Sequence, residues 1–320
     1  MVPLSFVIPP TKGRIDDATL ESNVRSACQR NWPEYPWMSH HRETWLICGG
    51  GPSIGEKEHL RTLRELSRRS KFRIIALNRT HDFLLKMGIK PWAGVLLDPS
   101  PPVKTYMTPV RGVKYFIASQ CAPETLDVFE GAEKYLWHAL ATGAEQKPLS
   151  WKQKIHCVAG DSTVGLRAIP FGYALGARRF HLFGFDSSYK DNDPTTKQMH
   201  AYDKPETKHK IVPITIPFDA DHVRAGGKTY WTNEMMGRQA GEFQDTILRF
   251  QRLVKTGQIE TFGMWVHGSG LIPDMARHYG LHWDQKKEWL DVGRRLSSGR
   301  GCIRIPPTRD PASETGSVHC

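Results

Sequence analysis

Short apolar runs alternate with amphipathic stretches between residues 44 and 186, and this alternation predicts most of the fold. Because the runs are apolar throughout, they are typical of strands buried on both faces of a parallel sheet. Intervening stretches repeat their apolar positions every three or four residues, as helices do. The expected strands are "TWLICGG" (44–50), "FRIIALN" (72–78), "WAGVLLD" (92–98), "VKYFIAS" (113–119), "KYLWHA" (134–139), "IHCVAG" (155–160) and "RFHLFGFD" (179–186). We therefore predict an α/β fold, a Rossmann-like doubly wound, mostly parallel sheet with helices on both faces.

The segments outside this alternation divide the chain. Residues 1–43 are polar and aromatic, and we interpret them as an N-terminal arm with one helix near 17–30. The Rossmann-like domain covers 44–296 and includes a long polar loop, 187–232, whose prolines argue against a packed element. A helix is expected at 233–257, then a strand in "IETFGMW" and a helix in "LIPDMARHYG". The tail, 297–320, has few apolar residues and is expected to be disordered.

Composition and charge narrow the partners. The net charge of +11 suits anionic ligands such as nucleotides and does not exclude nucleic acid. None of the six cysteines forms a C-x-x-C pair, and several lie in apolar runs, which indicates a reducing, cytoplasmic environment. There is no signal-peptide pattern, and no run reaches the roughly 18 apolar residues that span a membrane.

A glycine-rich junction, "WLICGGGPSIGEKEHL" (45–60), is the first candidate site. It matches neither the dinucleotide fingerprint, because Ile54 stands where the third glycine belongs, nor the P-loop, whose lysine would be one position late. Glycines still allow the backbone to approach a ligand, and the following helix offers free N–H groups to an anion. The alternative is a turn that binds nothing. The expected nucleotide-facing residues of this loop are Gly49, Gly50, Gly51, Pro52 and Ser53.

Polar residues at the ends of the other strands extend the candidate site, because ligands of such sheets bind outside the carboxyl ends of the strands. Asn78 is a further nucleotide-binding candidate, and Asp98 and Asp186 are candidate ligands for Mg²⁺ bound to phosphates. Gly160, Ser162 and Thr163 belong to a second ligand-facing loop. The alternatives are a turn former at Asp98 and helix caps at Asp161 and Ser162.

The long loop after Asp186 carries reactive side chains. His200 is a candidate general acid or base, and Tyr189 and Tyr202 are candidate stacking groups. The alternative for His200 is a solvated loop histidine. The stretch "FDADHVRAGG" (218–227) has metal-like residues, but their spacing matches no defined site. We expect the loop to close over an acceptor as a lid.

Four motifs in order, "ICGGGPSIG", "LLDPS", "VAGDSTVGLRA" and "HLFGFDSSYKDN…HAY", resemble the MptE-like family of 6-hydroxymethylpterin pyrophosphokinases. The chain is also similar to the core of the Maf flagellin-glycosylation proteins, more distantly to Rossmann-type sialyltransferases, and to compact phage-encoded relatives. The resemblance implies that Gly49, Gly51, Pro52 and Ser53 face the nucleotide. It gives Asp98 the D-P position and Gly160, Ser162 and Thr163 the second loop. It makes Asp186 and His200 the catalytic pair.

Three functions remain open at this point. The first is diphosphoryl transfer from ATP to a hydroxymethyl acceptor, with Mg²⁺ on the phosphates. The second is a glycosyltransferase that uses a nucleotide-activated sugar such as a CMP-nonulosonate, with a small-molecule or glycan acceptor. The third is a nucleotide-binding or assembly protein without catalysis.

Overall fold

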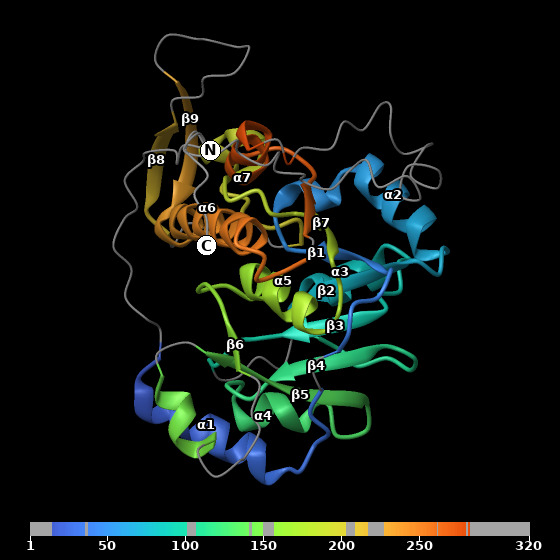
Figure 1. Cartoon of the computed structure of the whole chain (residues 1–320). Coiled ribbons are helices and arrows are strands. Elements are labelled where there is room, and N and C mark those ends of the chain that lie inside the picture. Colours follow the sequence, from blue (N-terminus) through green and yellow to red (C-terminus); the bar gives the residue numbers. More distant parts are fainter. Residues whose placement is uncertain are drawn as a thin grey trace, which may run out of the picture.

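The computed structural model describes residues 15–35, 38–100, 107–140, 143–149, 157–202, 209–216, 227–260, 262–279 and 281. Its centre is one sheet with helices on both sides (Figure 1). The sheet consists of β1 (Thr44–Cys48), β2 (Phe72–Leu77), β3 (Ala93–Leu96), β4 (Lys114–Ala118), β5 (Glu133–Leu140), β6 (Cys157–Ala159), β7 (Arg179–Phe183) and β10 (Gly263–Val266).

The order of the strands defines where a ligand site belongs. The order is β10-β7-β1-β2-β3-β4-β5-β6, and all neighbouring pairs are parallel. The chain thus runs outward from β1 to β6, returns to the other side of β1 as β7, and continues to β10. This confirms the predicted doubly wound fold. The reversal places the topological switch point between β1 and β7, where such sheets open a crevice at the carboxyl ends of their strands.

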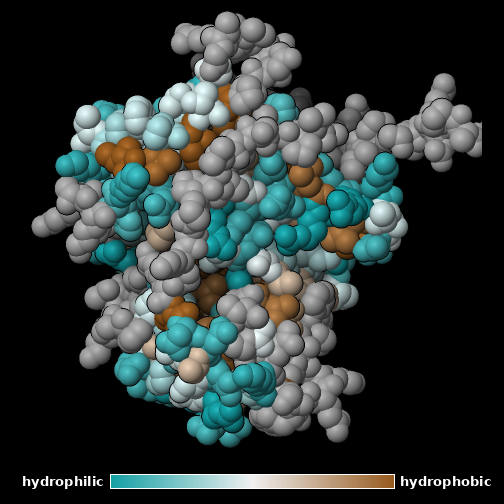
Figure 2. Space-filling view, turned by 90° about the vertical axis from the view of Figure 1, so that its left-hand side faces the viewer, coloured by the Kyte–Doolittle hydropathy of each residue, from teal (hydrophilic) through white to brown (hydrophobic). Residues whose placement is uncertain are grey.

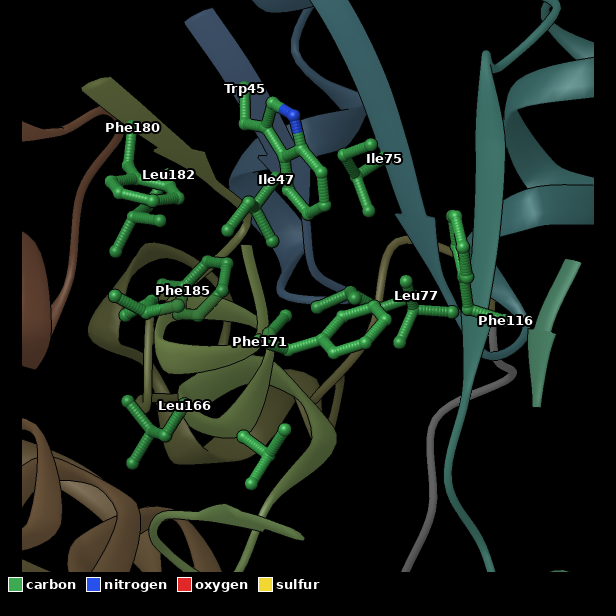
Figure 3. Packing of buried hydrophobic residues seen from close by; sticks show 14 of the residues in the cluster. Trp45, Ile47, Ile75, Leu77, Phe116, Leu166, Phe171, Phe180, Leu182 and Phe185 are labelled. Carbon is green, nitrogen blue, oxygen red and sulfur yellow. The ribbon is translucent and has the colours of Figure 1, made fainter. Parts of the chain in front are cut away.

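Alternating side chains of the central strands bury two hydrophobic layers. Trp45 and Ile47 of β1 belong to one cluster, and Leu46 and Cys48 belong to the other. The first cluster packs against α5 (Val164–Ala174), whose Phe171 faces the sheet (Figure 3). Each such large side chain stabilises the fold by about 1.5–3 kcal/mol. A strand buried on both faces reads as a continuous apolar run, which is why these strands were predictable.

Side-chain caps begin some of the helices. Asp16 caps the first helix, since its carboxylate accepts a hydrogen bond from the Thr19 N–H at 2.8 Å. Asn233 caps the long α6 (Glu234–Lys255) in the same way through the Met236 N–H. Besides α5, the helices are α1 (Asp17–Gln29), α2 (Lys57–Ser67), α3 (Thr80–Lys86), α4 (Pro123–Asp127), α6 (Glu234–Lys255) and α7 (Leu271–His278). Short 3₁₀ turns are η1 (Pro52–Gly55), η2 (Ala144–Leu149), η3 (Lys190–Asn192) and η4 (Pro194–Thr196). In the part of the chain that the structure describes, no helix is long and apolar enough to span a membrane.

The prediction that 187–232 contains no packed element is wrong. The segment forms an antiparallel hairpin of β8 (Ile211–Ile216) and β9 (Lys228–Asn233). Tyr230 of β9 is fully buried, and the Tyr189 N–H donates to the Trp231 carbonyl at 2.9 Å. Proline misled the prediction, because Pro213 lies exposed in β8 and an edge strand tolerates it. Most of "FDADHVRAGG" lies outside the described residues, as does the tail 297–320.

The N-terminal segment attaches to the far end of the sheet. Its helix α1 buries Val24 and Ala27, which confirms the helix expected near 17–30. Beyond it, the Leu136 N–H of β5 donates to the Pro33 carbonyl at 2.8 Å, and a β-bridge joins Glu34 to Leu136. The residues predicted as an arm therefore contribute packing and backbone pairing to the domain.

Candidate active site at the switch point

Three loops meet at the switch point, and backbone hydrogen bonds join them. The glycine loop after β1 donates from the Gly49 N–H to the Phe183 carbonyl at 2.8 Å and from the Gly51 N–H to the Gly184 carbonyl at 2.9 Å. The loop after β10 leads into α7, whose Ile272 N–H donates to the Asp186 carbonyl at 3.2 Å. The carboxyl ends of β1, β7 and β10 are thus held as one unit.

The packing of the protein itself requires glycine at several positions of this loop. A Cβ at Gly49 would lie 2.7 Å from the Gly184 carbonyl oxygen, and one at Gly51 would lie 2.8 Å from the Asp186 Cγ. A Cβ at Gly50 would overlap the Tyr202 hydroxyl. A larger side chain at Gly51, such as valine, would therefore disturb the junction of β1 with β7 whether or not a ligand is bound.

Asp186 lies at the centre of this junction. Its two carboxylate oxygens accept hydrogen bonds from the Ser53 N–H at 2.6 Å and the Ser53 Oγ at 2.5 Å. The side chain is buried, and burial raises the pKa of this carboxyl to about 7, opposed by the two hydrogen bonds from Ser53 and reinforced by the negative charge of Glu56. An uncharged Asp186 is thus substantially populated near neutral pH. Ser53, predicted to face a nucleotide, has Asp186 as its partner.

The two predicted metal ligands do not converge. Asp98 follows β3 and Asp186 follows β7, with β1 and β2 between them, so their backbones are about 14 Å apart at the usual strand spacing. A single Mg²⁺ sits about 2.1 Å from each of its ligands and cannot contact both. Both oxygens of Asp186 accept hydrogen bonds from Ser53. Asp98 is half-buried, and its side chain accepts a hydrogen bond from the Ser100 N–H at 2.9 Å. Within the described residues, no group of three His, Cys, Asp or Glu side chains is placed to hold a metal.

His200 and Tyr202 cover the glycine loop. The Ala201 N–H between them donates to the Gly50 carbonyl at 3.0 Å, and the two rings stack at 5.4 Å with an interplanar angle of 7°. The Cδ2 atom of His200 would be 2.9 Å from a Cβ at Gly50. The structure therefore brings the predicted acid–base residue to the glycine loop, although it follows Asp186 by many residues.

At the end of β2 lies a further candidate site residue, Arg79, which the sequence analysis did not predict. Asn78 adopts a left-handed conformation, and its side-chain amide pairs with Leu97, accepting from its N–H at 3.2 Å. This clamp between β2 and β3 directs the next residue, Arg79, toward the glycine loop, where its guanidinium lies 5.1 Å from the Tyr202 ring centroid. In the sequence, only the position of Arg79 just after a predicted strand, in "ALNRTHDF", indicated a site residue. The same position indicated Asn78.

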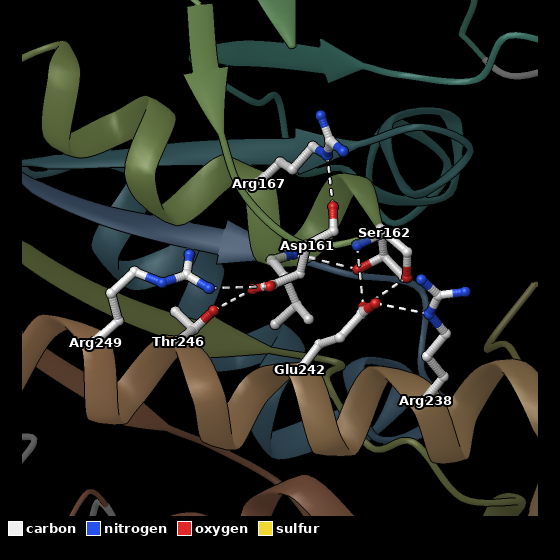
Figure 4. Close-up of polar contacts among 9 residues, drawn as sticks. Asp161, Ser162, Arg167, Arg238, Glu242, Thr246 and Arg249 are labelled. Carbon is white, nitrogen blue, oxygen red and sulfur yellow. Dashed lines mark hydrogen bonds and ion pairs between the residues drawn. The ribbon is translucent and has the colours of Figure 1, made fainter. Parts of the chain in front are cut away.

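The second loop also has partners within the protein. Ser162 donates from its N–H (3.0 Å) and its Oγ (2.5 Å) to the Glu242 carboxylate of α6 (Figure 4). Thr163 caps α5 by accepting from the Leu166 N–H at 3.3 Å. Asp161, whose pKa burial raises, accepts from Thr246 and forms an ion pair with Arg249. The loop is thus tied to α6.

Phe185 connects the two loops. Its ring lies 3.3 Å from the position of a Cβ at Gly49 and 2.9 Å from that of a Cβ at Gly165, near the start of α5. Ser187 donates to Gln239 of α6 at 3.0 Å. Gly160, which precedes α5, has Arg167 packed against it. On the face of the molecule that carries α6 and the β8–β9 hairpin, hydrophobic residues form several separate patches among hydrophilic ones (Figure 2).

Fold and site together define a doubly wound α/β protein with a glycine-rich loop at its switch point. A family model described as "6-hydroxymethylpterin diphosphokinase MptE-like" matches residues 22–192, and the chain belongs to this family. It is similar to the solved Maf glycosyltransferase from Magnetospirillum magneticum AMB-1, with a TM-score of 0.52 and 14% identity. That match covers 80% of this chain but only 38% of the Maf protein, so it shows the fold alone. No curated protein gave a significant match.

Proposed function

We propose that this chain is a transferase that binds a phosphate-bearing nucleotide at the switch point between β1 and β7. The convergence of the loops after β1, β7 and β10 on Asp186 is the observation that carries the proposal. Membership of the MptE-like family supports diphosphoryl transfer from ATP to a hydroxymethyl acceptor as the reaction. Such transfer depends mainly on positioning and charge neutralisation, which rigid loops at a sheet edge supply.

The residues have separate roles in this proposal. His200, held against Gly50, takes the proton from the acceptor hydroxyl as the acceptor oxygen bonds to the β-phosphorus of ATP, and the bond from that phosphorus to the bridging oxygen breaks to release AMP. Asp186 and Ser53 hold the glycine loop in place and do not contact the acceptor. Asp98 is the residue that fits Mg²⁺, and the ion would neutralise charge on the phosphates when bound.

A glycosyltransferase using a nucleotide-activated sugar, such as a CMP-nonulosonate, is the second candidate. The observation that favours it is the engagement of both Asp186 oxygens by Ser53, because this reaction depends less on a metal ion and does not need Asp186 as its ligand. His200 would assist proton transfer here too. The acceptor would be a small molecule or a glycan.

A thermal-shift panel separates these functions, because a ligand that binds only the folded state raises the Tm. The panel contains ATP, GTP, CTP, CMP and nucleotide sugars, each with and without Mg²⁺. A Tm increase with ATP that depends on Mg²⁺, followed by AMP release in the presence of a hydroxymethylpterin, supports the diphosphokinase. An increase with CMP or a nucleotide sugar without metal supports the glycosyltransferase. Binding without transfer to any acceptor indicates a non-catalytic role, and no binding at all contradicts the proposal.

A further inference from the structure

Two independent features place Arg79 near the glycine loop. From its own side, the left-handed Asn78 ends β2 and turns the chain, and the Asn78 side chain is fixed to Leu97. From the other side, Tyr202 presents its ring to the guanidinium at 5.1 Å. Tyr202 is itself fixed, because its hydroxyl packs on Gly50 and its ring contacts Phe83 at 6.0 Å. The positive charge of Arg79 is therefore held one aromatic ring away from the loop.

Acidic side chains already lie at the switch point, so a nearby cation such as Arg79 affects the binding of an anion there. Asp186 is buried there, and the charge of Glu56 acts on it. An anionic ligand at the same loop adds further negative charge, which costs free energy unless a cation compensates it. A guanidinium suits this task, since its planar set of donors matches phosphate oxygens and its charge persists at all relevant pH values.

We infer that Arg79 binds the phosphate of the nucleotide at the glycine loop, and that Tyr202 orients its guanidinium for this contact. The inference rests on the proposed function and names the residue that recognises the anionic part of the ligand. Stacking on Tyr202 limits the orientations of the guanidinium, whose five N–H donors allow a phosphate contact beside the interactions that Arg79 already makes. Arg79 thus binds the phosphate, while other residues bind the nucleoside.

The chain offers a matched control in Arg73. This arginine lies near the start of β2, whereas Arg79 follows its end, so the two occupy opposite edges of the sheet. Arg73 also stacks on an aromatic ring, Trp92, at 5.4 Å, and it is also half-buried. It pairs with Glu43 through its Nε at 2.9 Å. A substitution at Arg73 therefore reproduces the loss of charge and of stacking away from the site.

The test compares each nucleotide with its phosphate-free nucleoside. The dissociation constants of ATP and adenosine, and of CMP and cytidine, are measured by calorimetry for the wild type, Arg79→Gln, Arg79→Lys, Tyr202→Leu and Arg73→Gln. We expect Arg79→Gln to weaken binding of the recognised nucleotide about 10- to 100-fold, as the loss of a charged hydrogen bond does. Nucleoside binding should change less than about twofold, because only the phosphate contact is removed. Arg79→Lys and Tyr202→Leu should give smaller losses of the same kind, and Arg73→Gln should have no effect.

Two outcomes overturn this inference while the proposed function stands. The first is unchanged nucleotide binding in Arg79→Gln. The second is an equal loss of nucleotide and nucleoside binding, which shows that Arg79 only supports the His200–Tyr202 segment. If the wild type binds none of these nucleotides, the proposed function and this inference fail together. The Tm of each unliganded variant confirms that it is folded.

Discussion

Asp186 and Ser53 join the loops after β7 and β1 through two short hydrogen bonds, 2.6 Å from the Ser53 N–H and 2.5 Å from its Oγ. They lie 133 positions apart in the chain, yet their contact closes the switch point. A carboxyl in this place fixes the glycine loop. Its burial also makes the contact depend on pH.

We predict that Asp186 makes stability fall as the pH rises. Its pKa is raised to about 7 in the folded protein from 3.8, so the folded state holds the proton more tightly than the unfolded chain. The stabilising effect is complete below the unfolded pKa and is lost as the pH rises through the folded pKa. Over this window the free energy of unfolding should fall by up to about 4 kcal/mol.

Asp186→Asn isolates this effect, because an amide mimics the neutral carboxyl and still pairs with the Ser53 N–H and Oγ. Urea unfolding from about pH 4.5 to about 7.5 should show the stability of the wild type falling relative to that of the variant. Comparing the two proteins cancels the opposite effect of the buried His181, whose pKa is lowered to about 3 by burial. A constant difference across this range contradicts the assignment.

Gly51→Ala should destabilise the fold even without a ligand. Its Cβ would lie 2.8 Å from both the Asp186 carboxylate and the Gly184 carbonyl oxygen, so one of the two loops must shift. We expect a loss of about 1–3 kcal/mol, the usual cost of overpacking. Gly131→Ala is the control, since a Cβ there has nothing within 4 Å. Chemical denaturation measures both, and equal stability of the two variants contradicts a packed glycine loop.

The sequence predicted the sheet because each central strand is a continuous apolar run, and burial on both faces requires that pattern. It could not predict the contacts of the site. Asp186 looks the same in sequence whether it faces a metal or Ser53, and the difference arises from the pairing of β7 with β1. Arg79 has no pattern of its own and is placed by Tyr202, which is remote in the chain. The β8–β9 hairpin was missed because Pro213 outweighed the alternation around it.

The two aspartates predicted as metal ligands should respond differently to substitution. We expect Mg²⁺ to increase the Tm shift caused by ATP in the wild type, and Asp98→Asn to remove most of this increase, because a neutral amide is a poorer ligand for a hard cation. Asp186→Asn should retain it, since Ser53 engages both Asp186 oxygens. Asp193→Asn, at an exposed turn, is the control. Loss of the Mg²⁺ effect in Asp186→Asn alone would reverse the assignment.

His200 should affect turnover more than nucleotide affinity. Its ring stacks on Tyr202 and its edge faces Gly50, so replacing it by alanine removes both a proton acceptor and part of the cover of the loop. His200→Phe separates the two roles, since it keeps an aromatic ring for the stack but has no ring nitrogen. If His200 is the general base, both variants should lower kcat about 100-fold or more, with nucleotide Kd nearly unchanged in His200→Phe. Steady-state kinetics with the acceptor, together with calorimetry of the donor, measures both quantities. A His200→Phe protein with full turnover would show that the residue only packs against the loop, because the ring would then suffice without its nitrogens.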